Sequence, residues 1–448
     1  MRKITIQFVT ELKQIYKSPI AKDGLWSIIL KSTSTCLTFL ATVFLARKLG
    51  ASGYGVYAYA FALINLISIP AHAGLPDLVT RETAQAIALK KWSYVKGIWR
   101  WSGRMVALLS IFIVIILGPL FTMWQGGIQN IKGQTFILAL LLVPLIALGN
   151  LRGAALRGLQ HIVAGQIPEF LLRPAFFLLF IIGALLLVPN KFSAPLAMAM
   201  YVLASLLSFL IGAWMLWWYT PRKLLKSQPP AQKKEWLSSS LMFALIVGFS
   251  VINNQASTVI LGIIESPTDV GLFKVALQVG ILASFVLQAI NRTVAPHFAD
   301  LYVKGEISRL QRLVTYSARV VLLFNLILTG AFITLGQILL PLFFGSEFAA
   351  SYYPLLILLI GQIVNSAAGS VGYLLNMTGN EKETLRGVSI ASGVNIVLNL
   401  TLIPFLGVTG AAIATAISMI TWNVLLWWRV RTVLGINSLA FNIPLKIR

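Results

Sequence analysis

Apolar runs fill most of this sequence, and their length is the strongest constraint on what it can fold into. Two of them, near 24–46 and 53–75, flank a short segment that contains Gly50, Gly53 and Gly55. A helix needs about twenty apolar residues to cross the ~30 Å hydrocarbon core of a bilayer. This pair is therefore predicted to form a hairpin of two membrane helices joined by a tight glycine turn.

The composition supports the same class over the whole chain. Of the 448 residues, 58% are hydrophobic and 11% are charged, whereas a soluble domain carries roughly 25% charged residues. The single cysteine, Cys36, excludes a disulfide within the chain. The net charge of +23 falls mostly in alternate loops, where basic residues orient helices and meet anionic membrane lipids. We expect a polytopic membrane protein with no nucleic-acid partner.

We expect twelve spans, near 24–46, 53–75, 103–124, 134–151, 166–188, 195–219, 238–264, 270–291, 316–343, 353–376, 385–405 and 409–428. Placing the N-terminus in the cytoplasm leaves only four basic residues in external segments: Arg47, Lys48, Lys132 and Lys191. Because cytoplasmic loops carry the excess of Lys and Arg, both termini are predicted to be cytoplasmic.

The two halves of the sequence repeat each other. Gly55-Val56-Tyr57 recurs as Gly271-Leu272-Phe273, and at nearly the same offset Ser102–Val106 is matched by Ser317–Val321. Each half has an even number of spans, so the repeats are parallel and related by a pseudo-two-fold axis along the membrane normal. We predict an all-α fold of two six-helix lobes, 1–219 and 238–448. The hydrophilic segment 220–237 is a cytoplasmic linker or a basic helix on the membrane surface.

No constellation for catalysis or for a metal is present in the sequence. His72, His161 and His297 are scattered and match no metal-ligand spacing. The glycines at 50, 53 and 55 join two membrane helices rather than a strand and a helix, so they form no dinucleotide loop. We therefore expect no enzymatic activity, no metal and no cofactor.

Polar residues inside the spans are the candidates for ligand binding, because such residues are costly in hydrocarbon. Lys31 has Ser34 and Thr38 near its face of the helix, and Lys274 is followed one turn later by Gln278. These residues and Asn254 are predicted to line a central cavity; snorkelling of Lys31 and interhelical hydrogen bonding by Asn254 are the alternatives. Arg81, Arg173 and Arg292 lie at predicted cytoplasmic mouths, where a role in topology and a role in ligand entry are both open.

Acidic residues are nearly absent from the spans. Glu169 and Asp269 come closest, and each is placed near a span end. An antiporter for cationic drugs would need a buried carboxylate in the amino-terminal lobe, and we identify none. A cationic interior instead suits an anionic ligand, such as a pyrophosphate or an acidic sugar.

Several stretches resemble the polysaccharide transporter branch of the multidrug/oligosaccharidyl-lipid/polysaccharide exporter superfamily, which includes O-antigen and lipid-linked oligosaccharide flippases. They are Phe44-Leu-Ala-Arg-Lys-Leu-Gly50 with Gly53-Tyr-Gly-Val-Tyr57, Gly74-Leu75 with Arg81-Glu82, 339–348, Asn376-Met-Thr-Gly-Asn380 and 399–415. The resemblance implies a V-shaped pair of lobes in a bacterial inner membrane. It also implies a flippase that moves an undecaprenyl-pyrophosphate-linked oligosaccharide to the periplasmic leaflet by alternating access.

The same resemblance implies a cationic cavity with basic residues in the first, second and eighth helices. Lys31 and Lys274 lie on the predicted first and eighth spans, but the second has only Arg81, beyond its end. The resemblance allows a polysaccharide polymerase and its chain-length machinery as partners. It also allows transport that is coupled to an ion gradient. The alternatives are a drug or metabolite antiporter of the same superfamily, or a membrane glycosyltransferase or polymerase, which would need an external catalytic loop that is not visible.

Overall fold

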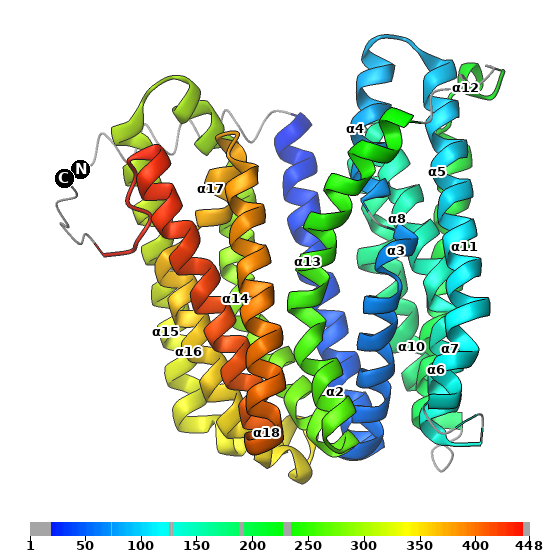
Figure 1. The fold of residues 1–448 in the computed structure, drawn as a ribbon, viewed down its shortest axis with the longest axis vertical. Coiled ribbons are helices and arrows are strands. Elements are labelled where there is room, and N and C mark those ends of the chain that lie inside the picture. The colour runs from blue at the N-terminus through cyan, green and yellow to red at the C-terminus, as the bar shows by residue number, and fades with distance from the viewer. Residues whose placement is uncertain are drawn as a thin grey trace.

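The computed structural model describes residues 19–72, 74–124, 127, 129–187, 192–226 and 234–441, and every regular element in these ranges is a helix. Within these ranges, ten helical stretches are long and apolar enough to cross a membrane. The helices gather in two groups that lie side by side (Figure 1). The expectation of an all-helical polytopic membrane chain is confirmed.

The first group, which we call the first bundle, holds the amino-terminal helices. It consists of α2 (Pro19–Ile67), α3 (Ile69–His72), α4 (Leu75–Ala88), α5 (Trp92–Phe112), the π-helical η1 (Ile113–Leu117), α6 (Gly118–Trp124), α7 (Ile131–Leu140), α8 (Leu142–Gly158), α9 (Ile162–Ile167), the π-helical η2 (Pro168–Leu172), α10 (Arg173–Leu187), α11 (Ala194–Tyr219) and α12 (Arg222–Lys226).

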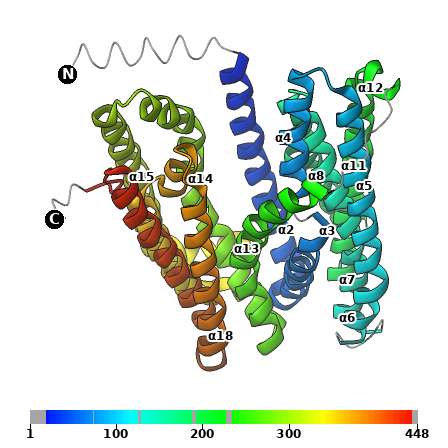
Figure 2. The same ribbon diagram turned by 45° about the horizontal axis from the view of Figure 1, so that its top comes forward.

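The second bundle lies beside it, and α13 (Lys234–Ile264) runs between the two (Figures 1 and 2). The second bundle consists of α14 (Pro267–Val303), α15 (Ile307–Phe344), the 3₁₀ turn η4 (Ser346–Ser351), α16 (Tyr352–Ala368), α17 (Val371–Met377) and α18 (Glu381–Leu434). The first half of α13 packs on the first bundle, where Trp236 donates a hydrogen bond to Tyr94. Its second half contacts α18, where the hydroxyls of Ser257 and Thr415 form a hydrogen bond of 2.9 Å.

Two of the helices, α2 and α18, each reverse the direction of the chain (Figure 1). The backbone leaves the helical conformation at Gly50, with φ 66°, and at Gly407, with φ 50°. A residue with a Cβ rarely adopts a positive φ, so glycine is the residue suited to both bends. The tight turn predicted from the glycines after residue 46 is confirmed at Gly50.

Small residues allow the membrane helices to approach one another closely. The second segment of α2 buries Ala58, Ala60 and Ala62, and a Cβ on Gly262 of α13 would lie 2.2 Å from the ring of Tyr59. Lipid tails are as apolar as leucine, so helices in a bilayer associate through such close packing rather than by hiding large apolar side chains. Large side chains instead cover the outside, and Leu187 is 84% exposed.

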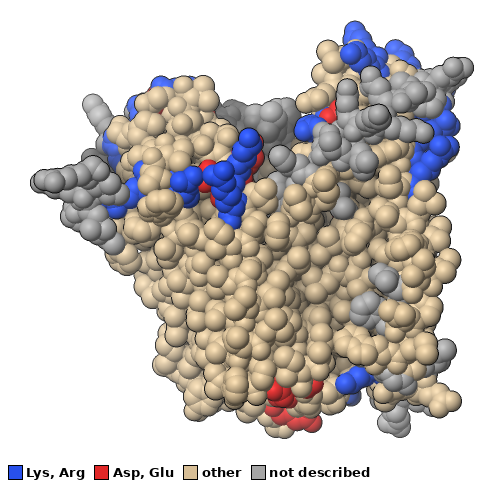
Figure 3. Space-filling view, viewed as in Figure 1, with Lys and Arg blue, Asp and Glu red and all other residues tan. Residues whose placement is uncertain are grey.

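Charged residues gather at the two ends of the helices (Figure 3). Lys and Arg dominate the end that carries the α4–α5 and α14–α15 connections, which we call the basic end. Glu265, Asp269 and Glu347 lie at the opposite end, around the start of α14 and in η4, and we call this the acidic end.

Candidate functional site

A buried ion pair lies inside the first bundle. Arg152 of α8 is 5% exposed, and its Nη2 lies 3.1 Å from Oε1 of Glu169 in η2. Its Nη1 donates to the backbone carbonyls of Ser208 and Phe209 on α11, at 3.2 Å each. Its Nε has no hydrogen-bond partner in the described ranges. Because a buried charge must be paired to be tolerated, Arg152 and Glu169 depend on each other.

Glycines on two helices make the room that this pair occupies. A Cβ on Gly212 of α11 would lie 1.5 Å from Nη1 of Arg152, so the guanidinium lies directly on that glycine. Gly149 and Gly153 of α8 face Oε1 of Glu169, at 3.5 and 3.4 Å from the position of an added Cβ. Glu169 itself sits on a π-helical turn, an irregularity that is frequent at functional sites.

Two further arginines surround the pair. Arg157 of α8 and Arg173 of α10 lie close enough for their charges to act on Glu169. Neither guanidinium has a hydrogen bond or an ion pair to any residue that the structure describes. Outside the membrane-spanning helices, burial raises the pKa of the Asp77 carboxyl, and the charge of Arg157 opposes that rise. Basic groups therefore outnumber acidic groups in this part of the first bundle.

The expectation that no carboxylate is buried in the amino-terminal half is wrong. The predicted spans ended at 151 and began again at 166, which left Arg152 and Glu169 at span ends. The helices continue to Gly158 and start at Ile162, so both residues lie inside the bundle. Sequence reasoning also missed Arg152 as a candidate; a charged residue between Gly149 and Gly153 in an apolar run was the available signal.

Lys31 and Lys274 are both half-buried, and they lie far apart. Lys274 is one turn from Gly271, which packs on Ala51 of α2. Lys31 is twenty residues before Ala51 on the same helix, a distance of about 30 Å at 1.5 Å per residue. These two lysines therefore do not form one binding site in this structure.

The other residues proposed for the cavity lie beside the two lysines or on α13. Ser34 and Gln278 are half-buried and Thr38 is exposed. Asn254 is exposed and donates to the carbonyl of Ser250 in its own helix at 2.8 Å. The interhelical bond expected in this region is made by the preceding residue, since Ser418 of α18 donates to Oδ1 of Asn253.

The three mouth arginines have different surroundings. Arg81 is exposed, donates to Glu82 and lies 5.4 Å from the ring centroid of Phe243, so it links α4 to α13. Arg173 belongs to the buried cluster described above. The side chain of Arg292 lies outside the described part of the chain.

Helix ends bind each other across the two bundles at the acidic end. Ala51 is the first residue after the bend in α2, and its backbone N–H donates a hydrogen bond of 2.7 Å to the carboxylate of Glu347 in η4. Arg47, just before that bend, donates to the carbonyls of Phe343, at 2.7 Å, and Leu342 at the end of α15. Helix termini leave such N–H and C=O groups unpaired and carry opposite partial charges. We call these two interactions the reciprocal caps.

Backbones also meet at this end. A Cβ on Gly55 would lie 1.6 Å from the carbonyl oxygen of Pro267, and one on Gly271 would lie 2.1 Å from that of Ala51. At the basic end the surface is hollowed between the two groups of helices (Figure 3), and the ribbons diverge there (Figure 2). The molecule is thus closed at the acidic end and open at the basic end.

Known proteins provide independent comparisons. The family model for polysaccharide biosynthesis proteins matches residues 20–302. A protein of Haloferax volcanii named a probable low-salt glycan biosynthesis flippase, Agl15, is 25% identical over 96% of this chain and 85% of its own length. A putative O-antigen transporter of Shigella flexneri is 24% identical over 91% of this chain and 97% of its own length.

Among solved structures, the lipid II flippase MurJ in an inward closed conformation has a TM-score of 0.72 to this chain. The match covers 91% of this chain and 87% of that one, at 13% sequence identity. At this level of identity the likeness shows that the two chains share a fold.

Proposed function

This chain belongs to the family of polysaccharide biosynthesis proteins, and from that premise we propose that it is a flippase for a lipid-linked oligosaccharide. Two relatives along most of its length carry the names of a glycan biosynthesis flippase and an O-antigen transporter. We further propose that the carrier is undecaprenyl pyrophosphate and that the membrane is a bacterial inner membrane.

The observation that carries this proposal is the basic cluster inside the first bundle. Arg152, Arg157 and Arg173 surround one carboxylate, Glu169, so the local field favours an anion. A pyrophosphate headgroup would lose many kcal/mol of hydration in bare hydrocarbon. Arginine is suited to replace that hydration, because its planar guanidinium matches phosphate oxygens in a bidentate manner. The lipid tail can stay in the bilayer while the headgroup and sugars pass between the bundles.

We propose that the basic end faces the cytoplasm, as the excess of Lys and Arg there favours. If each segment of α2 and α18 crosses separately, the ten helical stretches become twelve crossings. Six would then lie in each lobe, 1–219 and 238–448, joined by 220–237. The described conformation would be the one that opens to the cytoplasm and receives the substrate.

A reciprocal contact supports the parallel repeat. The offset of 216 residues that relates Gly55 to Gly271 also relates Ala51 to Pro267. Gly55 packs on Pro267, and Gly271 packs on Ala51. A two-fold axis generates such a pair of contacts, because it carries the contact between Gly55 and Pro267 onto the contact between Gly271 and Ala51.

The separation of Lys31 and Lys274 changes the role that we propose for them. Lys31 lies towards the open basic end, and Lys274 lies near the closed acidic end. They would attract the headgroup at different steps of the cycle rather than together. Ser34, Thr38 and Gln278 would accompany them, and Asn254, Arg81 and Arg292 remain candidates along the path.

A second candidate, a drug or metabolite antiporter of the same superfamily, is favoured by one observation. Glu169 is a carboxylate held inside the first bundle, and such a group can bind a cation or a proton. However, Arg152 pairs with it at 3.1 Å, and Arg157 and Arg173 add further positive charge nearby. A cationic substrate would be repelled unless these arginines moved away. If Glu169 couples transport to an ion gradient, a proton is the ion that its surroundings admit most easily.

Glycan export in a strain that lacks its own flippase tests the proposal, with export normalised to the amount of inserted protein. We expect Arg173→Gln to reduce export at least tenfold and Arg173→Lys to retain part of it, because the lysine keeps the charge. Arg312→Gln is the matched control, since it removes an exposed basic residue of α15 outside the cluster. Wild-type export by Arg173→Gln, Lys31→Ala and Lys274→Ala alike would remove the cationic path from the mechanism.

A further inference from the structure

The first bundle has a groove on the side that faces away from the second bundle. This groove of about 490 Å³ lies between α5 and α11, and both helices pack against α8, which forms its floor. In Figures 1 and 2, α5 and α11 lie on the side of the first bundle opposite α14–α18. The groove is thus separate from the hollow between the bundles, and it opens where membrane lipid surrounds the protein.

The walls of the groove are apolar. They are formed by residues on three helices, including Trp99, Leu148, Leu151, Phe209, Leu216 and Trp217. From Trp217 to Phe209 the groove follows α11 for eight residues, about 12 Å at 1.5 Å per residue. Trp217 is 67% exposed, and exposed tryptophans mark the level of the lipid headgroups. The groove therefore extends from the headgroup level into the hydrocarbon.

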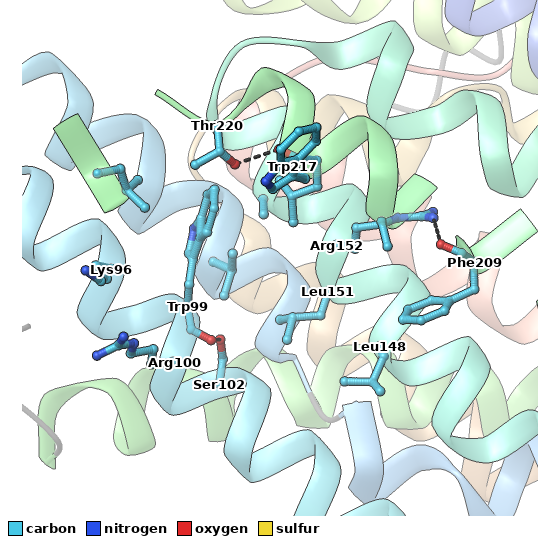
Figure 4. Close-up of a pocket in the computed structure, with 15 residues that line it drawn as sticks. Lys96, Trp99, Arg100, Ser102, Leu148, Leu151, Arg152, Phe209, Trp217 and Thr220 are labelled. Atoms are coloured by element: carbon cyan, nitrogen blue, oxygen red, sulfur yellow. Dashed lines mark hydrogen bonds between the residues drawn. The ribbon is translucent and has the colours of Figure 1, made fainter. Parts of the chain in front are cut away.

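Positive charge borders the groove towards the basic end. Lys96 and Arg100 of α5 line it one helical turn apart, so they lie on the same face of the helix. In Figure 4 they lie on the side of the pocket opposite Arg152. The short helix α12 packs on α5 and places the buried Leu224 in the lining, with Arg222 and Lys223 exposed beside it. A ligand here meets apolar walls and basic groups at one end.

The inner side of the groove reaches the buried ion pair. Arg152 lines the groove and is 5% exposed, and its Nε has no hydrogen-bond partner in the part of the chain that the structure describes. Figure 4 shows its guanidinium directed to the carbonyl of Phe209. An apolar chain in the groove would keep water away from the pair between Arg152 and Glu169 and so strengthen it.

We propose that this groove binds an anionic phospholipid of the leaflet at the basic end, with one acyl chain between α5 and α11 and its phosphate on Lys96 and Arg100. The walls offer too few polar groups to hold sugars, so a glycan headgroup is not the occupant. Lys96 and Arg100 provide the complementary charge for a phosphate, and the depth of the groove accommodates part of one chain. This site lies outside the hollow between the bundles, although it shares Arg152 with the basic cluster, and it does not depend on the identity of the transported glycan.

Native mass spectrometry of the purified full-length protein tests the proposal, with phosphatidylglycerol and phosphatidylcholine of identical chains as probes. We expect the wild type to retain phosphatidylglycerol in preference to phosphatidylcholine. Lys96→Gln/Arg100→Gln should lower the affinity for phosphatidylglycerol about 25-fold, because each basic residue near an anionic lipid surface contributes roughly fivefold. Arg309→Gln/Arg312→Gln removes two exposed charges from the basic end of the second bundle and should have no effect.

A second variant separates the chain from the headgroup. Ala213→Phe fills the groove from α11 and leaves Lys96 and Arg100 in place, so it should also release phosphatidylglycerol; an unchanged melting temperature verifies its fold. Glycerol 3-phosphate, which has no chain, should not displace the lipid. The proposal is overturned if the wild type binds both lipids equally, if either variant retains phosphatidylglycerol as the wild type does, or if glycerol 3-phosphate competes as well as the intact lipid.

Discussion

The reciprocal caps provide a direct way to shift the balance between the closed and open states of the acidic end. Glu347→Ala removes the carboxylate that accepts from the N–H of Ala51 at 2.7 Å. Hydrogen bonds to charged groups contribute about 1.5–3 kcal/mol, and Glu347 is exposed to solvent, so we take the lower value. At 1.4 kcal/mol per factor of ten, the variant should shift the equilibrium about tenfold towards opening at the acidic end.

Distances between spin labels can measure this shift. Labels at Lys48 of α2 and Tyr353 of α16 are exposed and lie on different bundles at the acidic end, and Cys36→Ser removes the native thiol. If the closed form makes up about 99% of the wild type, a tenfold shift lowers it to about 90%. A longer distance should then appear in the variant. Glu347→Gln keeps a neutral acceptor, so its effect should be smaller.

The control is Glu265→Ala, which removes another carboxylate from the acidic end. The carboxylate of Glu265 lies near Gly407 of α18, on the side of the second bundle. It makes none of the contacts with α2 described above. If Glu347→Ala and Glu265→Ala give the same distances as the wild type, the caps do not hold the bundles together. If both variants open the molecule equally, the cause is the loss of negative charge and not the hydrogen bond to Ala51.

Three further predictions concern close packing and topology. Gly212→Ala should expel the guanidinium of Arg152, which lies 1.5 Å from the added Cβ. Breaking a buried pair costs about 3–5 kcal/mol, so the melting temperature should drop. Gly183→Ala should leave it unchanged, because among the described residues the new Cβ meets no atom within 4 Å outside its own helix backbone. Gly55→Ala should weaken the contact with Pro267, so disulfide cross-linking between the bundles at the acidic end should decrease; unchanged cross-linking would contradict the packing described here. A reporter fused after Lys226 should be active in the cytoplasm, and periplasmic activity there would invert the proposed orientation.

The sequence by itself determined the class of the fold and its local turns. Runs of about twenty apolar residues specify membrane helices, because hydrocarbon leaves the backbone no other partner than itself. The bend at Gly50 followed from glycines between two such runs, since a positive φ there favours a residue without a Cβ. These features depend on the bilayer and on neighbouring residues, so no tertiary contact is needed to predict them.

The candidate site was predicted only in part, because the important contacts join distant segments. Arg173 was predicted as a mouth residue, but only the structure places it beside Arg152 and Glu169. In a helix that is apolar on every side, the sequence does not show which face meets a neighbour, and α8 is such a helix, with buried residues on all sides.

The tertiary structure also decided which charged residues act together. Lys31 and Lys274 were expected to share one cavity, yet Lys31 lies near the start of α2 and Lys274 lies beside the bend in the middle of that helix. Across the bundles, Arg47 instead binds the carbonyl of Phe343, and Glu347 binds the backbone N–H of Ala51; the residues of each pair are almost 300 positions apart in the chain. The physical reason is that a buried or interfacial charge is stabilised by the polar groups that neighbouring helices place beside it. Which groups these are depends on how two helix ends approach each other in space, and not on the sequence around either residue.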